Sequence, residues 1–155
     1  MNVGFIFGMI FAAIVIGLLL LFGVKYFGEM SEAACESQMG QQITNLRSAV
    51  RSTLTLSKDS VQELRVIVSG CFEKICFVDP NHPEDYPEAG WDPENHVRLI
   101  VTNEKSNVII YKSSGVVKGH KIEKFRPYVN FCMTSTKTVT LQNTGKLVEI
   151  TLPEF

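Results

Sequence analysis

The sequence lacks most of the residue patterns that enzymes and nucleic-acid-binding proteins carry. It has one tryptophan and three scattered histidines in 155 residues. It contains no Walker-type phosphate loop and no serine or cysteine in a nucleophile elbow. The formal net charge of -1 and the lack of a basic, aromatic stripe argue against a nucleic-acid partner. We therefore expect neither an enzyme nor a resident cofactor.

Charged residues are also missing from the first part of the chain. Residues 3–24, VGFIFGMIFAAIVIGLLLLFGV, contain none, and about 20 such residues cross a ~30 Å hydrocarbon core as a helix. A signal peptide is the alternative, but it has a basic start and an apolar stretch of only about 7–15 residues. The sequence therefore predicts a transmembrane anchor over residues 1–27, surrounded by membrane lipid.

Small residues recur within this apolar run. Gly4, Gly8 and Ala12 are spaced by four residues, which is the spacing that lets transmembrane helices pack closely. The alternative is that Gly and Ala are simply common in such helices. If the spacing is functional, the anchor packs against copies of itself or against another membrane or surface protein.

An amphipathic pattern follows the anchor over residues 28–58. The apolar positions recur in steps of three and four, with polar residues between them. They are Met39, Ile43, Leu46, Val50 and Leu54. This periodicity predicts a stalk helix that is continuous with the anchor.

The remaining residues, 59–155, have the composition of a β-rich head. Seven segments are rich in Val, Ile, Thr, Phe and Tyr and are separated by Gly, Asn and Pro. They are residues 61–69, 74–79, 96–102, 107–112, 128–134, 137–142 and 146–152. Short turns between successive segments predict an antiparallel sheet, so the chain is expected to be an α+β protein with one head on a helical stalk.

Turn residues predict hairpins between some of these segments. TNEKSN, residues 102–107, separates the third segment from the fourth. NTG, residues 143–145, separates the last two and offers Gly145 for a positive φ angle. The basic segment SSGVVKGHK, residues 113–121, is expected to be the charged tip of a hairpin.

Four cysteines follow the anchor, at positions 35, 71, 76 and 132. The helix after Cys35 and the returning strand that ends at Cys71 would each span roughly 33 Å, which predicts that these two cysteines meet in a disulfide bond. Cys76 and Cys132 then remain, either to pair across adjacent strands or to stay as buried thiols. The spacing does not fit a zinc site.

The cysteines also bear on the side of the membrane. Lys25 is the only cation close to the anchor, so the positive-inside rule does not decide the orientation. An even number of cysteines is typical of an oxidising compartment. We therefore expect a single-pass protein of the cell membrane whose C-terminal head is extracytoplasmic.

One acidic segment, residues 79–96, has the length and composition of a functional loop. It has four prolines, no Lys or Arg, and the aromatic residues Tyr86 and Trp91. Its acidic residues are Asp79, Glu84, Asp85, Glu88, Asp92 and Glu94. A solvated surface loop is one interpretation, and a loop that binds a partner or Ca²⁺ is the other. The spacing of a calcium-binding loop is missing, so no defined metal site is predicted.

Several segments in this order resemble a known group of proteins. An anchor followed by ACESQMGQQITNLRSAV, then KICFVD, PYVNFCMT and TGKLVEITL, is similar to archaeal single-pass, membrane-anchored surface proteins of unknown function. The general build is also similar to that of type IV pilins. The resemblance implies location and architecture.

Two functional hypotheses follow. The first is a structural or assembly role, as a subunit of a pilin-like filament or of an envelope complex. The second is a binding module displayed at the surface that uses the acidic segment.

Overall fold

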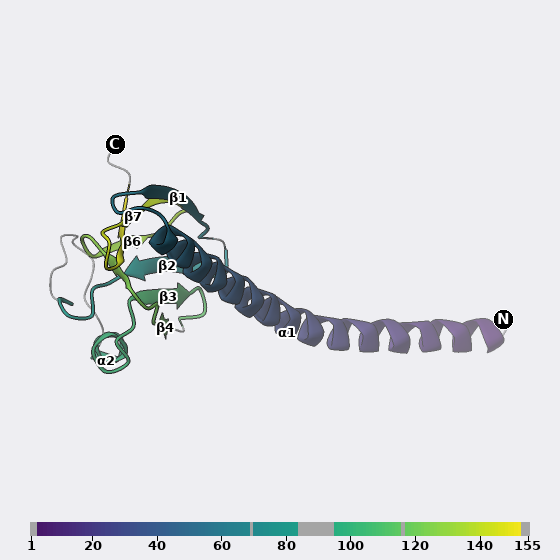
Figure 1. Cartoon of the computed structure of the whole chain (residues 1–155). Coiled ribbons are helices and arrows are strands. Elements are labelled where there is room, and N and C mark those ends of the chain that lie inside the picture. The colour runs from purple at the N-terminus through teal and green to yellow at the C-terminus, as the bar shows by residue number, and fades with distance from the viewer. Residues whose placement is uncertain (1–2, 69, 84–94, 116, 153–155) are drawn as a thin grey trace. The chain divides into compact units, whose positions relative to one another are not determined.

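The computed structural model describes residues 3–68, 70–83, 95–115 and 117–152. A long N-terminal helix leads into a β-rich head that carries a second, short helix (Figure 1). The chain divides into two compact units, Met1–Gly40 and Gln41–Phe155, and each is described by itself. The predicted α+β class, with an antiparallel-rich head, is confirmed.

The helices and strands of the described residues follow in chain order. They are α1 (Val3–Thr55), β1 (Val61–Val66), β2 (Phe72–Phe77), α2 (Asn95–Asn103), β3 (Val108–Lys112), β4 (Val117–His120), β5 (Phe125–Pro127), β6 (Phe131–Met133), β7 (Lys137–Asn143) and β8 (Val148–Thr151).

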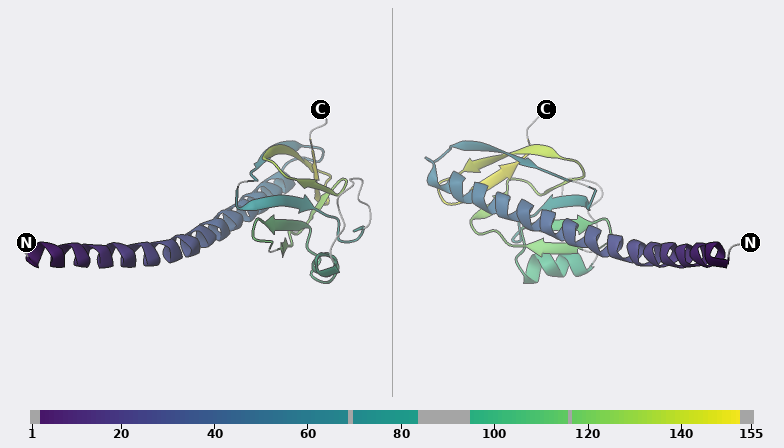
Figure 2. Two further views of the ribbon diagram at one scale, coloured as in Figure 1. Left: turned by 180° about the vertical axis from the view of Figure 1, so that it is seen from behind. Right: turned by 90° about the vertical axis from the view of Figure 1, so that its right-hand side faces the viewer.

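The end of α1, from Gln41 onward, belongs to the head. Ile43, Leu46 and Val50 are buried on one face, as the sequence periodicity predicts, because positions three or four apart share one side of a helix. Thr53 continues this face, and its hydroxyl donates to the carbonyl of Ala49 at 2.8 Å. This stretch of α1 lies across strands of both sheets (Figure 2).

The first sheet has the strand order β1-β7-β8-β5. β1 pairs with β7, and β7 with β8, in antiparallel fashion, whereas β5 pairs with β8 in parallel. Along β7 the side chains of Val139 and Leu141 are fully buried, while those of Thr138 and Gln142 are exposed. One face of this sheet therefore packs into the core, and the other face is solvated.

The second sheet has the order β4-β3-β2-β6. Its central residues Ile75, Cys76 and Phe77 are all buried, so β2 is covered on both faces. On one side Phe77 packs against Phe125 of the first sheet, with ring centroids 6.0 Å apart. On the other side Cys76 belongs to a cluster that includes residues of α2. The head is therefore layered, with the second sheet in the middle.

Two of the predicted hairpins are confirmed. The NTG turn joins β7 to β8, and Gly145 has a φ angle of 91°. The basic segment 113–121 contains the turn and the second strand of the β3–β4 hairpin, and the amide of Gly115 donates to the carbonyl of Lys112 at 2.9 Å. Both glycines have positive φ angles, which residues with a side chain rarely adopt.

One predicted strand is wrong. Residues 96–102 were expected to be extended because they are rich in β-branched side chains, but they form α2, so the predicted hairpin at TNEKSN does not exist. Val97 and Val101, four residues apart, are both buried, whereas Leu99 between them is exposed. A strand would place all three on one face, so burial on the second sheet selects the helix.

The sheet arrangement also differs from a simple antiparallel sheet. The described residues of the head form two sheets, which include the short strands β4 and β5 that the sequence pattern did not predict. β5 pairs with β8 in parallel, and after β5 the chain continues through residues 128–130 into β6 of the other sheet. It therefore never forms a hairpin with its neighbour.

Candidate functional site

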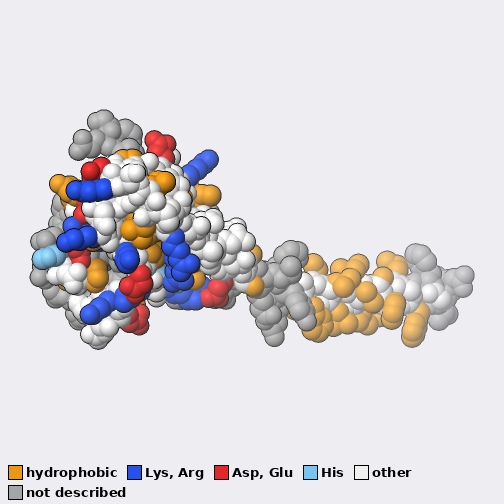
Figure 3. Space-filling model, in the orientation of Figure 1, with side chains coloured by type: hydrophobic (Ala, Val, Ile, Leu, Met, Phe, Trp, Pro, Cys, Tyr) orange, Lys and Arg blue, Asp and Glu red, His pale blue; other side chains and the backbone are white. Residues whose placement is uncertain are grey.

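The first candidate surface is the apolar segment of α1. Ile6–Gly23 is 18 residues long with a mean hydropathy of 2.8, and none of it is buried within the chain. Five consecutive side chains, those of residues 18–22, are 49% to 75% exposed. Consecutive positions on a helix point about 100° apart, so these exposed apolar side chains project on every side of it. Figure 3 shows apolar side chains along the face in view. By length and composition, the segment can cross a membrane.

The small residues of this segment leave open space around the helix. A Cβ atom built at Gly4 or Gly8 meets nothing within 4 Å, and the side chain of Ala12 is exposed. A second helix can approach closely along such positions. Packing of the anchor through Gly4, Gly8 and Ala12 stays a prediction.

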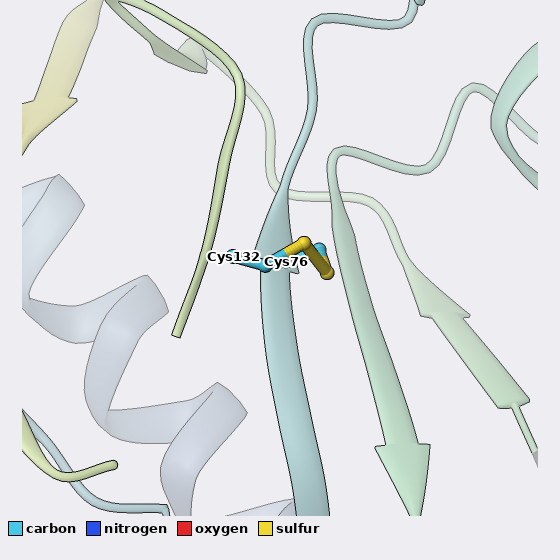
Figure 4. The surroundings of a disulfide bond; sticks show 2 residues. All are labelled: Cys76 and Cys132. Carbon is cyan, nitrogen blue, oxygen red and sulfur yellow. A yellow bond between two sulfur atoms is a disulfide. The ribbon is translucent and has the colours of Figure 1, made fainter. Parts of the chain in front are cut away.

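The second feature is a disulfide bond between Cys76 and Cys132. The two residues lie opposite each other in the register of β2 and β6, and their sulfur atoms are bonded (Figure 4). Cys76 is completely buried and belongs to the cluster under α2. The bond thus links two neighbouring strands of the second sheet, and the cross-strand alternative considered for these cysteines is confirmed.

The other two cysteines lie in different units of the chain. Cys35, in the first unit, is buried, and Cys71, in the head, is half-buried and directly precedes β2. Their disulfide pairing stays a prediction, because each unit is described by itself.

Of the acidic segment, the structure describes Asp79 and the turn that follows it. Asp79 is buried, and its Oδ1 accepts hydrogen bonds from the backbone amide and the side-chain amide of Asn81, at 2.9 and 3.1 Å. The predicted binding residues Glu84, Asp85, Tyr86, Glu88, Trp91, Asp92 and Glu94 lie outside the described residues.

Asn130 fixes this turn to the strand that carries the disulfide bond. Its Oδ1 accepts a hydrogen bond from the amide of Asp79 at 2.6 Å, and its Nδ2 donates to the carbonyl of His82 at 2.8 Å. Asn130 itself is buried and directly precedes β6. The position at which the chain enters the acidic segment is therefore held by the same part of the sheet as Cys132.

A cavity of about 330 Å³ opens beside this turn. Such a volume accommodates a small ligand or a side chain of a partner. The cavity is lined by Asp79, His82, Arg126, Pro127, Tyr128, Val129, Asn130 and Glu149. Tyr128 and Val129 are 71% and 47% exposed at its rim, so they offer an aromatic and an apolar contact to whatever approaches.

The charges in the cavity are partly neutralised by one ion pair. Arg126 of β5 donates to Oε1 of Glu149 on β8 from both Nε, at 3.0 Å, and Nη2, at 2.6 Å. The two residues are register partners in the parallel pair. Across the part of the chain that the structure describes, no group of three or more His, Cys, Asp or Glu side chains is arranged to hold a metal ion. The described lining offers polar and aromatic side chains for contacts.

His120 on β4 is a half-buried titratable group of the head. Within the described residues its Nε2 is buried without a hydrogen-bond partner. Burial lowers the pKa of this imidazole below 6.5, and the positive charges of Arg47 and Lys118 lower it further. These surroundings therefore favour the neutral form of the His120 side chain.

The residues that line the cavity were largely missed by the sequence interpretation. Arg126, Tyr128 and Asn130 lie far from Asp79 in the sequence and are brought to it by the strand order. The sequence pattern placed Tyr128 at the start of the strand-like segment 128–134, so it gave no signal that this side chain is exposed beside a cavity.

Comparison with known protein families, with curated proteins and with solved structures finds no match to this chain.

Proposed function

We propose that this protein is a membrane-anchored surface protein with a structural or assembly role. In this proposal α1 anchors the chain as a single span, and the head lies on the extracytoplasmic side, where it assembles with copies of itself or with other surface proteins. The observation that carries the proposal is the apolar segment Ile6–Gly23, which has no burial within its own chain. Exposed apolar surface of this extent requires lipid or a partner.

The disulfide bond supports the extracytoplasmic side. Disulfide bonds persist in oxidising compartments and are rare in the cytosol, and Cys76–Cys132 links two strands in the middle of the head. Secretion of the head would place this bond where it is stable.

Fractionation of cells that express the full chain tests the anchor. The wild type should remain in the membrane pellet after alkaline carbonate extraction. A variant with Ile14→Arg and Leu18→Arg should be released, because charged groups at the centre of a span each cost about 3 kcal/mol. Leu56→Arg, a charge placed on an exposed residue of the head, is the matched control and should stay in the pellet. Release of the wild type would overturn the anchor.

Protease protection tests the orientation. Protease added to intact cells should remove a C-terminal epitope tag. If the head were cytoplasmic, the protease would remove the tag only after the cells are lysed. Protection of the tag in intact cells would contradict the extracytoplasmic assignment and would leave the anchor itself in place.

A surface-displayed binding module is the second candidate, and the cavity favours it. The cavity opens where the chain enters the acidic segment, and Tyr128 is exposed at its rim. In this alternative the acidic segment and the cavity bind a partner or Ca²⁺. A Ca²⁺ titration of the melting temperature tests the metal version: a rise that is lost in Asp79→Asn supports it, and no rise eliminates it.

A further inference from the structure

Strand β1 is the terminal strand of the first sheet. It pairs with β7 on one side, over the full length Val61–Val66. No strand among the described residues pairs with its other side. An edge of six residues without proline is a template for another strand, because its outward N–H and C=O groups have no partner in the sheet.

The register shows which backbone groups face this open edge. The amide of Asn143 on β7 donates to the carbonyl of Ser60 at 2.9 Å, and pairs of this kind alternate along an antiparallel ladder. Gln62, Leu64 and Val66 therefore exchange hydrogen bonds with β7. The backbone groups of Val61, Glu63 and Arg65 point to the open edge.

The side chains of these odd-numbered residues lie together on the solvated face. Glu63 and Arg65 are exposed, and neither forms an ion pair within the described chain. Val61 at the start of β1 and Ile67 just after it are large hydrophobic residues that are 57% and 43% exposed. The exposed face thus reads, in chain order, apolar, acidic, basic, apolar.

We infer that β1 pairs with β1 of a second copy of this chain, antiparallel and centred on Leu64. Antiparallel pairing about Leu64 places Glu63 of each copy opposite Arg65 of the other. It also places Val61 of each copy opposite Ile67 of the other. Opposite charges and apolar pairs directly across two strands are the combinations that stabilise a sheet, so the edge is complementary to itself.

The neighbouring registers lack this complementarity. Centring the pair on Glu63 would oppose two carboxylates, and centring it on Arg65 would oppose two guanidinium groups. Like charges directly opposite are destabilising. Registers shifted by one residue from these would place an odd-numbered residue of one copy opposite an even-numbered residue of the other. The backbone groups of the even-numbered residues are already hydrogen-bonded to β7, so the two strands could not form a ladder. The register centred on Leu64 is the one that satisfies both the backbone and the charges.

This pairing deepens the proposed function and rests on it, because anchoring in one membrane is what brings the heads of two copies together. Charge complementarity identifies the partner as a second copy, because Glu63 and Arg65 of one β1 strand match Arg65 and Glu63 of the other. Anchors restricted to one bilayer raise the effective concentration of the two heads, which helps a short strand interface to form.

Charge reversal in the full-length chain tests the pairing. Copies carrying a donor or an acceptor fluorophore at the C-terminus are mixed in detergent micelles, and energy transfer reports association. Glu63→Arg alone and Arg65→Glu alone should each weaken association about tenfold, because each creates two like-charge pairs. Mixing the two variants should restore it, since a copy with two cations then meets a copy with two carboxylates. Glu104→Lys, on an exposed residue outside the sheets, is the matched control and should behave as the wild type.

The outcomes separate this inference from the proposed function. Weakening by each reversal with restoration in the mixture supports the β1 pairing. Association of the wild type that neither reversal changes overturns the pairing and leaves an assembly role through other surfaces. A wild type that is monomeric in every micelle overturns both. Circular dichroism melting of each variant shows that the head remains folded.

Discussion

The side-chain amide of Asn143 donates a hydrogen bond to the carbonyl oxygen of Leu56 at 2.9 Å. The same nitrogen donates to the carbonyl of Thr53 at 3.1 Å, and Oδ1 of Asn143 accepts from the amide of Gly145 at 2.8 Å. The last carbonyl groups of a helix have no partner within it. The side chain of Asn143 donates a hydrogen bond to two carbonyl groups at this end of the helix. It also accepts a hydrogen bond within the β7–β8 turn. Asn143 therefore fixes the end of α1 to the first sheet.

Replacing Asn143 with alanine should destabilise the head by about 1–3 kcal/mol, because its hydrogen bonds to Thr53, Leu56 and Gly145 are lost together. Urea denaturation followed by circular dichroism measures the change. The neighbouring substitution Gln142→Ala is the control, since Gln142 is exposed. Equal unfolding midpoints for the two variants would contradict the role of Asn143.

Gly119→Ala should also destabilise the head, by about 1–3 kcal/mol of overpacking. A Cβ atom at this position would clash with Cγ2 of Ile100 and would lie 2.6 Å from Oγ of Ser106. α2 and the segment after it approach β4 so closely that only glycine fits. Differential scanning calorimetry measures the effect. Gly70→Ala is the control, because a Cβ atom there meets nothing within 4 Å, and a melting temperature of G119A equal to that of G70A would refute the close approach.

Loss of the disulfide bond should destabilise the head strongly. The cysteines are 56 residues apart in the sequence, and a loop of that size corresponds to about 4 kcal/mol in the chain-entropy description. The double substitution Cys76→Ala with Cys132→Ala should lower the melting temperature. Dithiothreitol should lower the melting temperature of the wild type more than that of the double variant, because the variant has no Cys76–Cys132 bond to reduce. A double variant as stable as the wild type would contradict the prediction.

Non-reducing peptide mapping identifies the bonds directly. It should recover a peptide pair that contains Cys76 and Cys132. A second pair containing Cys35 and Cys71 would establish the predicted bond between the two units. Recovery of Cys71 bonded to Cys76 would contradict both assignments.

The stability of the head should fall as the pH is lowered from 7.5 to 5. The pKa of His120 is lowered in the folded state by burial and by the nearby Arg47 and Lys118. The unfolded chain therefore binds more protons below pH 6.5, and protonation favours unfolding. The stabilisation is fully present above the unfolded pKa and is lost as the pH falls from there through the lower folded pKa. In His120→Gln this part of the pH dependence should disappear. In the control His82→Gln, at an exposed histidine, it should persist. Parallel pH profiles of H120Q and the wild type would contradict this.

The sequence predicts those elements in which local preference and burial agree. Residues 137–143 and 148–151 alternate between apolar and polar positions and are joined by an Asn-Thr-Gly turn, and both are strands. The stripe of Ile43, Leu46 and Val50 has the helical period and is buried on one face of α1. In these segments the pattern itself specifies which face enters the core.

Where packing decides against local preference, the sequence is not enough. Residues 96–102 prefer an extended conformation by composition, but burial of Val97 and Val101 against the second sheet selects a helix. β5 is only three residues long, which is too short to show a strand pattern in the sequence. It is a strand because it pairs with β8. The cavity was missed for the same reason, since Asp79 and Arg126 line it together only after the two sheets have packed.

The disulfide bond has a consequence for proteolysis. The acidic segment, residues 79–96, lies between Cys76 and Cys132 in the sequence, so it belongs to the loop that the bond closes. A protease that cuts the chain once in this segment would leave an N-terminal piece and a C-terminal piece that are still covalently joined. The nicked protein would keep its mobility on a non-reducing gel and separate into two bands after reduction. An anchored head could thus be cut there without being released from the membrane.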